Sequence, residues 1–181
     1  MFAVLQKHRL TIARILALLA VVGISIFVYS IRDRAEEFAV YGYPGIFVLA
    51  FLANATVLLP APGIAVVFAM GGVFNPLLVG LAAGAGGALG EFSGYLAGFS
   101  GQAVVEHASI YQRMVAWMRR YGDFTILAMA AFPNPFFDLT GMAAGMLKMP
   151  FWRFLFWTWL GVTIKMLAFA YLGATSLEQW F

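Results

Sequence analysis

Five polar or charged side chains stand within otherwise apolar sequence, and these are the residues that could do chemistry: Asn54, Glu91, Asn134, Asp138 and Lys165. A charge in apolar surroundings is costly, so it usually has a partner or a task. A carboxylate in such a place can carry a proton, and amide, carboxylate and ammonium groups together can replace the water around a polar headgroup. We therefore interpret the five residues as a pathway for a substrate or a proton.

Each of these residues also has a structural interpretation. The two asparagines could cap broken helices, and Asp138 could cap a helix that begins after Pro135. Glu91 and Lys165 could simply neutralise each other. Both interpretations stay open at this point, because a capping carboxylate can also carry a proton.

An enzyme is not expected from this sequence. There is no cysteine, and the histidines, His8 and His107, are far apart along the chain. Hydrolysis needs a nucleophile with a base, or a metal, and neither intramembrane acid has a histidine or cysteine nearby in sequence. We expect no catalytic residue, no metal site and no cofactor. The alternative to transport is an assembly or scaffold protein, because small-residue helices make good interfaces and could also join copies into a homo-oligomer.

The composition is that of an integral membrane protein. Of the 181 residues, 63% are hydrophobic and only 10% are charged. We expect one all-α membrane domain over residues 1–181. The net charge of +3 lies mostly at segment ends, which suits membrane orientation and does not suggest a nucleic-acid partner.

Two Pro-x-Pro segments predict helical hairpins that enter the membrane and leave on the same side. Pro133 and Pro135 break an apolar stretch whose arms, residues 124–132 and 136–147, are both short. A helix rises about 1.5 Å per residue and a bilayer core is about 30 Å thick, so neither arm can span. Pro60 and Pro62 mark a second hairpin with a short return arm. We predict that these four prolines are the tips of two re-entrant hairpins.

The remaining apolar stretches complete the predicted architecture. A first transmembrane helix is expected at 10–31, and full-length spans are expected at 76–99 and 150–173, with a short tail at 176–181. Glycines at four-residue spacing in the 76–99 span should let another backbone approach closely. The predicted order is the first helix, repeat one at 41–99, an amphipathic helix at 101–120 and repeat two at 121–175.

The two halves form an internal repeat. An offset of 73 residues carries Pro60 and Pro62 onto Pro133 and Pro135. Glu91 and Lys165 each lie fifteen residues after the proline that opens their span, so they are counterparts of opposite charge. Each unit contains one crossing, and the second unit must therefore start on the opposite side of the membrane. The predicted fold is an inverted repeat, as in many transporters.

The charge distribution predicts a cytoplasmic N-terminus. With that orientation the cytoplasmic segments hold eight lysines and arginines and the opposite side holds two, Arg32 and Arg34. This is a clear positive-inside bias. The expected location is the plasma (inner) membrane of a prokaryote.

Two motifs resemble the DedA/VTT-domain (SNARE-associated Golgi protein) family. They are Gly90-Glu91-Phe92-Ser93-Gly94-Tyr95-Leu96-Ala97-Gly98 and Pro133-Asn134-Pro135-Phe136-Phe137-Asp138-Leu139-Thr140-Gly141. Pro150-Phe151-Trp152 and Gly161-Val162-Thr163-Ile164-Lys165 are similar to segments of the vacuole membrane protein branch. The resemblance covers roughly residues 40–175.

The resemblance implies a transporter whose partners are membrane lipids. It favours a phospholipid scramblase or flippase, with headgroups crossing through a groove at the hairpins. A proton-coupled carrier of polyprenyl phosphate is the alternative within the family. Many bacterial members carry arginines near the second hairpin, whereas Ala130, Ala131, Phe136 and Phe137 stand there in this chain. That difference argues against a strong phosphate clamp.

Overall fold

The computed structural model describes residues 35–55, 63–99, 108–134 and 136–178. Regular structure in these ranges is entirely helical, so the predicted all-α class is confirmed for them. The predicted first transmembrane helix at 10–31 lies outside the described residues, as do Pro60, Pro62, Pro135 and positions 101–107 of the predicted amphipathic helix. The described helices are α2 (Ala35–Ala55), α3 (Gly63–Gly71), α4 (Pro76–Gly90), α5 (Phe92–Phe99), α6 (Ala108–Tyr121), α7 (Asp123–Ala131), α8 (Phe137–Met146) and α9 (Phe151–Glu178).

Local sequence signals set several helix ends. The side-chain oxygen of Asn75 accepts hydrogen bonds from the backbone N–H groups of Leu77 and Leu78, at 3.0 and 3.3 Å, and Pro76 occupies the first turn of α4. This is the expected N-terminal cap followed by a proline that has no N–H to satisfy. Phe132, which ends α7, has extended backbone angles (φ −101°, ψ 136°). A residue before proline is pushed out of the helical region, so the break predicted before Pro133 is present.

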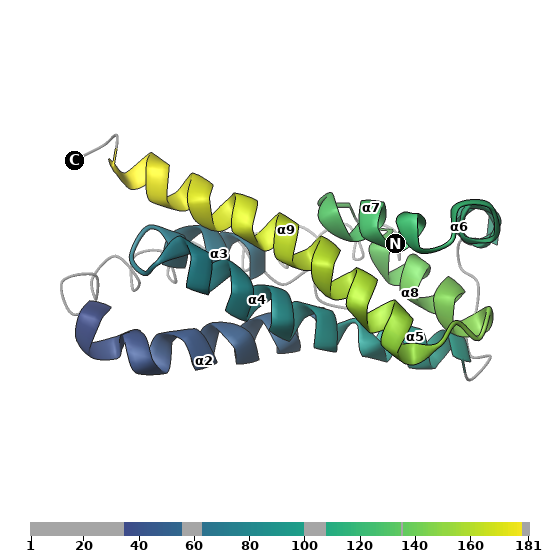
Figure 1. Ribbon diagram of the computed structural model, residues 1–181, viewed down its shortest axis with the longest axis horizontal. Coiled ribbons are helices and arrows are strands. Elements are labelled where there is room, and N and C mark those ends of the chain that lie inside the picture. Colours follow the sequence, from purple (N-terminus) through teal and green to yellow (C-terminus); the bar gives the residue numbers. More distant parts are fainter. Residues whose placement is uncertain (1–34, 56–62, 100–107, 135, 179–181) are drawn as a thin grey trace, which may run out of the picture.

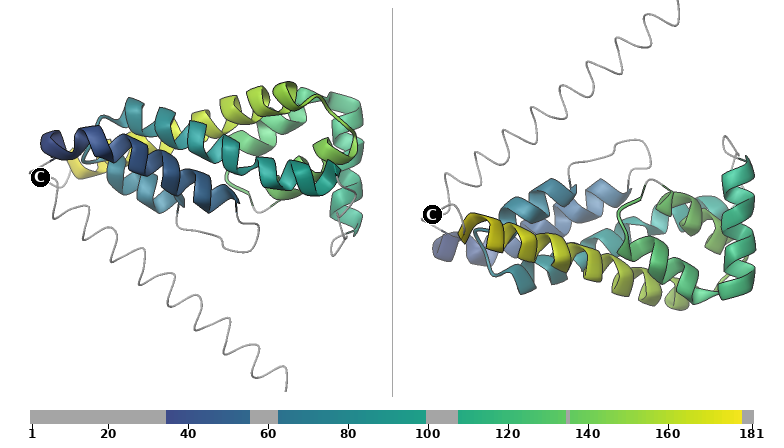
Figure 2. Two further views of the ribbon diagram at one scale, coloured as in Figure 1. Left: turned by 90° about the horizontal axis from the view of Figure 1, so that it is seen from below. Right: turned by 90° about the horizontal axis from the view of Figure 1, so that it is seen from above.

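Two long helical elements form the axis of the molecule. α4 followed by α5 runs along the long axis in one direction, and α9 lies beside them and runs the opposite way (Figure 1). α6 lies across one end, nearly perpendicular to α9 (Figure 2). Gly122 joins α6 to α7 with a positive φ of 57°, a conformation that glycine adopts without a steric penalty. The chain can therefore turn sharply from the cross-lying helix into the bundle.

The shorter helices form two hairpins that approach the middle of the molecule from opposite ends. α7 runs inward from the α6 end, and α8 returns to that end (Figure 2). α2 runs inward from the other end, and α3 returns to it (Figures 1 and 2). The turn at 132–134 and the helix ends that flank residues 56–62 thus all face the middle of the long axis.

Glycines bring the backbones of neighbouring helices into direct contact, and within the 76–99 span their four-residue spacing predicts this. At seven glycines an added Cβ would collide with a main-chain carbonyl of another helix, and one of these is Gly90 on Phe51. The other six contacts form three pairs in which the two halves of the chain exchange roles. These are Gly98 on Met142 with Gly173 on Phe68, Gly145 on Tyr95 with Gly71 on Ala170, and Gly86 on Phe47 with Gly161 on Leu127.

Two of the three pairs have nearly constant sequence offsets, whereas the contacted residues of the third, Phe47 and Leu127, differ by 80 positions. Gly98 and Gly173 differ by 75 positions, and their partners Phe68 and Met142 differ by 74. In the sequence repeat Glu91 and Lys165 differ by 74 positions and the hairpin prolines by 73, so these two pairs of contacts agree with the repeat within one residue. The second hairpin arm of each half therefore packs on the span of the other half, which interlocks the two halves.

Two element boundaries differ from the expectation. The span predicted as continuous over 76–99 is divided at Glu91 into α4 and α5, although the hydrogen bonds from Glu91 N to Gly87 O and from Tyr95 N to Glu91 O carry the chain across the junction. α9 continues to Glu178, beyond the predicted end at 173. A single glycine costs a helix only about 1 kcal/mol, so Gly173 does not end it.

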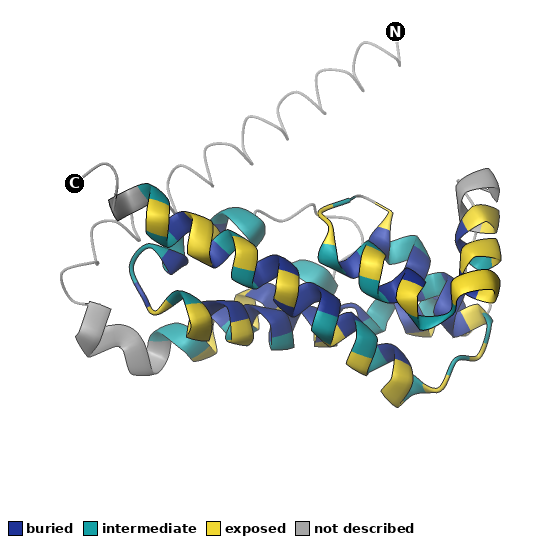
Figure 3. Ribbon diagram, turned by 45° about the horizontal axis from the view of Figure 1, so that its top comes forward, coloured by how far each residue is buried: buried dark blue, intermediate teal, exposed yellow. Residues whose placement is uncertain are grey.

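The outer surface carries many large apolar side chains. Phe124, Phe132 and Trp152 are 66%, 71% and 76% exposed, and exposed positions follow the outer faces of the helices (Figure 3). Pro76–Phe99 and Phe151–Ser176 are long and apolar enough to cross a membrane. A water-soluble protein rarely exposes so much contiguous apolar surface. The described part of the chain has the surface of a helical membrane protein.

Candidate functional site

A cluster of ionisable side chains lies inside the bundle. Glu91 and Lys165 are only 4% and 8% exposed, and Asp138 is partly buried. They come from three elements: the α4–α5 junction, the first turn of α8 and the middle of α9. The structure therefore brings together three of the five residues that the sequence singled out.

Close backbone packing places the two acids side by side. Gly94 lies one helical turn after Glu91, and a Cβ added to it would be 3.5 Å from the carbonyl oxygen of Asp138. α5 and α8 are in contact along this line. Because glycine adds no bulk between the helices, the Glu91 and Asp138 side chains can reach each other.

The three charged groups interact as a unit, which we call the charge cluster. The carboxyl groups of Glu91 and Asp138 lie close enough to interact directly, and Lys165 interacts electrostatically with both. The Lys165 ammonium also lies 5.8 Å from the centre of the Phe137 ring, within cation–π range. An ionised carboxylate has no proton to donate, so a hydrogen bond between the two acids would require a proton on one of them. With one shared proton, the acid pair carries a single negative charge that Lys165 balances.

Asn134 is used to build the hairpin turn. Its amide nitrogen donates to the carbonyl oxygens of Met129 and Phe132, at 2.7 and 2.8 Å, and its oxygen accepts from the backbone N–H of Phe136 at 3.1 Å. Both ends of the amide are therefore engaged with the backbone. The structural interpretation of Asn134 fits these contacts. Pro133, beside it, is exposed.

Asn54 lies near the end of α2, where its backbone packs on Gly90, the residue before Glu91. Its amide nitrogen donates to the carbonyl oxygen of Ala50 at 2.8 Å, one turn back in the same helix. A Cβ added to Gly87 would lie 3.2 Å from that nitrogen, so Asn54 faces α4.

Asp138 interacts with Glu91, and it also lies in the first turn of α8, where the positive end of the helix dipole stabilises a carboxylate.

Sequence reasoning missed three buried hydroxyl groups. Thr140, Thr158 and Thr163 are fully or almost fully buried on α8 and α9. The Thr140 hydroxyl approaches the sulfur of Met114 at 3.7 Å, whereas those of Thr158 and Thr163 have no hydrogen-bond partner among the described residues. The signal was available, since a threonine in an apolar span is a polar group that must be satisfied or hydrated. No group of three or more His, Cys, Asp or Glu side chains suited to a metal occurs in the described ranges.

Comparison with known proteins identifies a family. The VTT-domain family model matches residues 59–175, which is well over half of the chain. That range contains the charge cluster and both Pro-x-Pro segments. No solved structure matches the chain.

Among named relatives, vacuole membrane proteins match short segments of the chain. The Vacuole membrane protein 1 homolog of Dictyostelium discoideum is 40% identical over 53 residues, 29% of this chain and 13% of that protein. Vacuole membrane protein KMS1 of Arabidopsis thaliana is 36% identical over 61 residues, 32% of this chain and 15% of that protein. Vacuole membrane protein 1 of Homo sapiens is 45% identical over 47 residues, 26% of this chain and 12% of that protein.

These matches place the chain close to the vacuole membrane protein branch, as the motifs indicated. The matched segments span less than a sixth of the relatives' own length. All three relatives are eukaryotic membrane proteins by name. They support a membrane location and give no support to the prokaryotic plasma membrane expected above.

Proposed function

The chain belongs to the VTT-domain family, and on that premise we propose that it moves phospholipids between the two leaflets of a membrane. The headgroup crosses along a hydrated groove beside the hairpin turns while the acyl chains stay in the bilayer. The observation that carries this proposal is the buried charge cluster of Glu91, Asp138 and Lys165 beside the turn of the α7–α8 hairpin.

Helix lengths support hairpins that do not span. α3, α7 and α8 have 9, 9 and 10 residues, which at about 1.5 Å per residue makes each about half of a 30 Å bilayer core. The apolar part of α2, Gly42–Ala55, is also shorter than a full span. We interpret both hairpins as re-entrant, with turns near the membrane midplane. Irregular backbone at that depth persists only where protein buries it or water reaches it.

The reciprocal glycine contacts support an inverted repeat. The three exchanged pairs are what a two-fold axis between the halves would generate, and α4–α5 runs antiparallel to α9. Inverted repeats in transporters place their sites where the two units meet, near the midplane. The charge cluster draws Glu91 from the first unit and Asp138 and Lys165 from the second, so it lies at such a junction.

Weak headgroup selectivity follows from the chemistry of the cluster. When the two acids share one proton, their single negative charge and the positive charge of the lysine cancel. The three polar groups can then replace the water around a zwitterionic headgroup without a dedicated phosphate clamp. The α7–α8 turn carries Ala131 and Phe136 where a clamp would need arginine. This arrangement favours a scramblase over a carrier of polyprenyl phosphate.

The test is lipid movement in vesicles reconstituted with the full chain. Fluorescent phosphatidylcholine is followed by quenching of the outer leaflet, with and without a pH gradient. We expect the wild type to equilibrate the lipid without a gradient, and Glu91→Gln, Asp138→Asn and the double variant to be strongly impaired. Asp123→Asn is the matched control, because Asp123 is an acid that pairs with Arg153 at the end of the bundle, away from the cluster.

Three outcomes separate the alternatives. If the folded double variant moves lipid at the wild-type rate, the site assignment is wrong. If transport appears only with a pH gradient, the protein is a proton-coupled carrier. If the folded wild type moves no lipid under either condition, the scaffold interpretation replaces the proposal.

A further inference from the structure

A second candidate site, this one apolar, lies between α6 and α7 and shares no residue with the charge cluster. It is a pocket of about 370 Å³, within the size range of small-molecule sites. The Thr125 hydroxyl at its wall is already engaged, since it donates to the carbonyl oxygen of Trp117 at 3.1 Å. The interior is therefore largely apolar. The pocket is lined by Trp117, Tyr121, Phe124, Thr125, Ala128 and Met129.

Two arginines stand beside this pocket on the same flank of α6. Helical geometry of about 100° per residue places Arg113 one turn before Trp117 and brings Arg120 close to Arg113 around the helix. Both arginines are exposed, and the Arg120 guanidinium lies 5.2 Å from the centre of the Tyr121 ring. Arg119 points to the opposite flank by the same geometry. The pocket therefore has a positive rim on one side.

Among the described residues, the acid that opens α7 is already paired with another arginine. Asp123, at the start of α7, forms an ion pair of 2.7 Å with the side chain of Arg153. Met114 and Met118 are buried, which fixes the inward face of α6 and leaves its arginines on the outer side. The positive charge of Arg113 and Arg120 is thus turned outward beside an apolar cavity.

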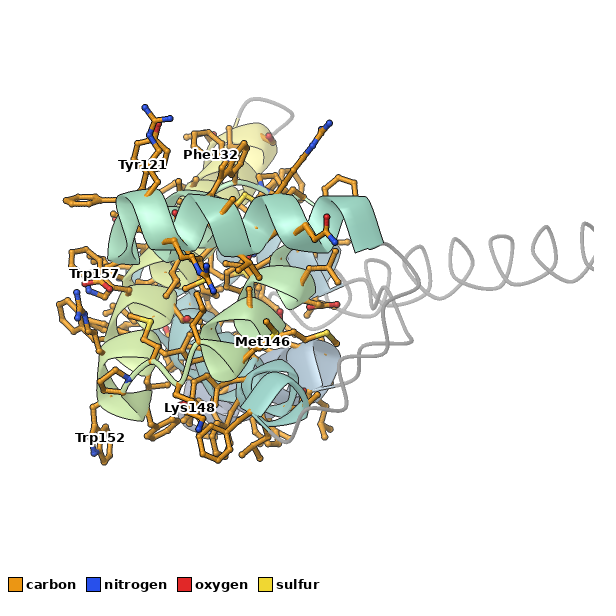
Figure 4. All side chains as sticks on the ribbon, turned by 90° about the vertical axis from the view of Figure 1, so that its right-hand side faces the viewer. Tyr121, Phe132, Met146, Lys148, Trp152 and Trp157 are labelled. Atoms are coloured by element: carbon orange, nitrogen blue, oxygen red, sulfur yellow. The ribbon has the colours of Figure 1, made fainter. Side chains whose placement is uncertain are left out.

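The position of the pocket matches the headgroup level of a bilayer. α6 lies across the end of the bundle (Figure 2), and in the view onto that end the labelled Tyr121, Trp157 and Trp152 lie along one side (Figure 4). Lys148 lies at the same end of the bundle (Figure 4). Interfacial tryptophan and tyrosine with basic residues mark the boundary between headgroups and acyl chains. A pocket at this level would meet both acyl chains and headgroups.

We propose that the α6–α7 pocket binds one anionic glycerophospholipid from the leaflet on the α6 side. An acyl chain fills the cavity between Trp117, Phe124 and Ala128, and the phosphate lies between Arg113 and Arg120. The occupant is a phospholipid because the apolar cavity suits an acyl chain and the adjacent arginines suit a phosphate. This lipid is a resident ligand that holds α6 on α7, and it is distinct from the lipids that cross at the hairpins.

The experiment measures which lipid the purified full chain retains. Protein is mixed with equal amounts of palmitoyl-oleoyl phosphatidylglycerol and phosphatidylcholine in detergent, and bound lipid is counted by native mass spectrometry. We expect the wild type to prefer phosphatidylglycerol. The Arg113→Gln/Arg120→Gln variant should lose roughly tenfold in retention, since charge-assisted hydrogen bonds to the phosphate are removed. Arg119→Gln, on the other flank of the same helix, should change little.

A second pair of variants tests the acyl chain. Ala128→Phe fills the pocket and should abolish retention, whereas Ala116→Phe, at an exposed position of α6 outside the pocket lining, should not. Glycerol phosphate, which has the anion without the chains, should not displace the bound lipid.

Several results would overturn the proposal. Equal retention of the two lipids, or an equal loss in Arg119→Gln, would reduce the rim to general surface charge. A dimer that Ala128→Phe dissociates, with no lipid bound, would make a second copy the occupant. If Ala128→Phe fails to fold, the comparison of the arginine variants still decides, because those side chains are exposed. The outcome is independent of lipid movement, so it can fail or succeed separately from the proposed transport.

Discussion

Replacing Lys165 by methionine should strongly destabilise the protein, because the two acids would keep a buried charge without its counterion. Removing one partner of a buried ion pair typically costs about 3–5 kcal/mol. In a protein of this size, about 1 kcal/mol corresponds to a shift of roughly 2–4 °C in Tm. Lys165 is 8% exposed, so solvent screens little of this cost. We therefore expect a drop of at least about 6 °C in thermal unfolding.

Matched variants test whether the lost charge is the cause. Lys165→Arg keeps the cation and should lose much less stability than Lys165→Met, whose side chain is of similar length. The triple variant Glu91→Gln/Asp138→Asn/Lys165→Met removes all three charges and should recover most of the loss, because neutral side chains in place of a buried ionic group are often no less stable.

The pH dependence gives a further check with a definite sign. In Lys165→Met the acid pair can shed its excess negative charge by binding a second proton. That proton is available at low pH and scarce at high pH, so the Tm difference from wild type should grow as pH rises. The assay is thermal unfolding of purified protein in detergent between pH 5 and 8. A Lys165→Met variant as stable as wild type, or a triple variant as unstable as Lys165→Met, would refute the reasoning.

Two further variants probe the packing and the turn. Gly98→Ala should be strongly destabilising because the new Cβ meets the main-chain carbonyl of Met142, whereas Gly45→Ala, with nothing within 4 Å, should be neutral or slightly stabilising; equal Tm values for the two would count against close packing of α5 on α8. Asn134→Ala should cost about 2–3 kcal/mol, since three hydrogen bonds to the hairpin backbone are lost, each worth about 1 kcal/mol. Unfolding of Asn134→Ala at the wild-type temperature would show that the turn does not depend on these bonds.

Local sequence determined much of the architecture. Pro133 forces Phe132 into extended backbone whatever surrounds it, and Asn75 with Pro76 begins α4 through contacts within a few residues. The four-residue glycine spacing requires only that a helix forms, so the close contacts of the 76–99 span were also predictable, whereas those made by glycines outside that span were not predicted. The two long spans follow from the length of the apolar stretches.

Longer-range features of the repeat were predictable in outline. Glu91 and Lys165 were recognised as counterparts because their positions relative to the preceding prolines repeat. The family relationship was likewise readable from contiguous motifs. The break of the 76–99 span at Glu91 was not, since glycine and alanine sequence on both sides favours neither a break nor continuity strongly.

Only the tertiary structure decided which charges meet. Glu91 and Asp138 lie beside each other because α5 packs on α8 at Gly94, and Lys165 interacts with them because α9 crosses the junction between the halves. Nothing in the local sequence of any one helix specifies which helix its buried face will meet. The pocket between α6 and α7 was invisible for the same reason, because a cavity is a property of how two helices are placed and not of either helix alone.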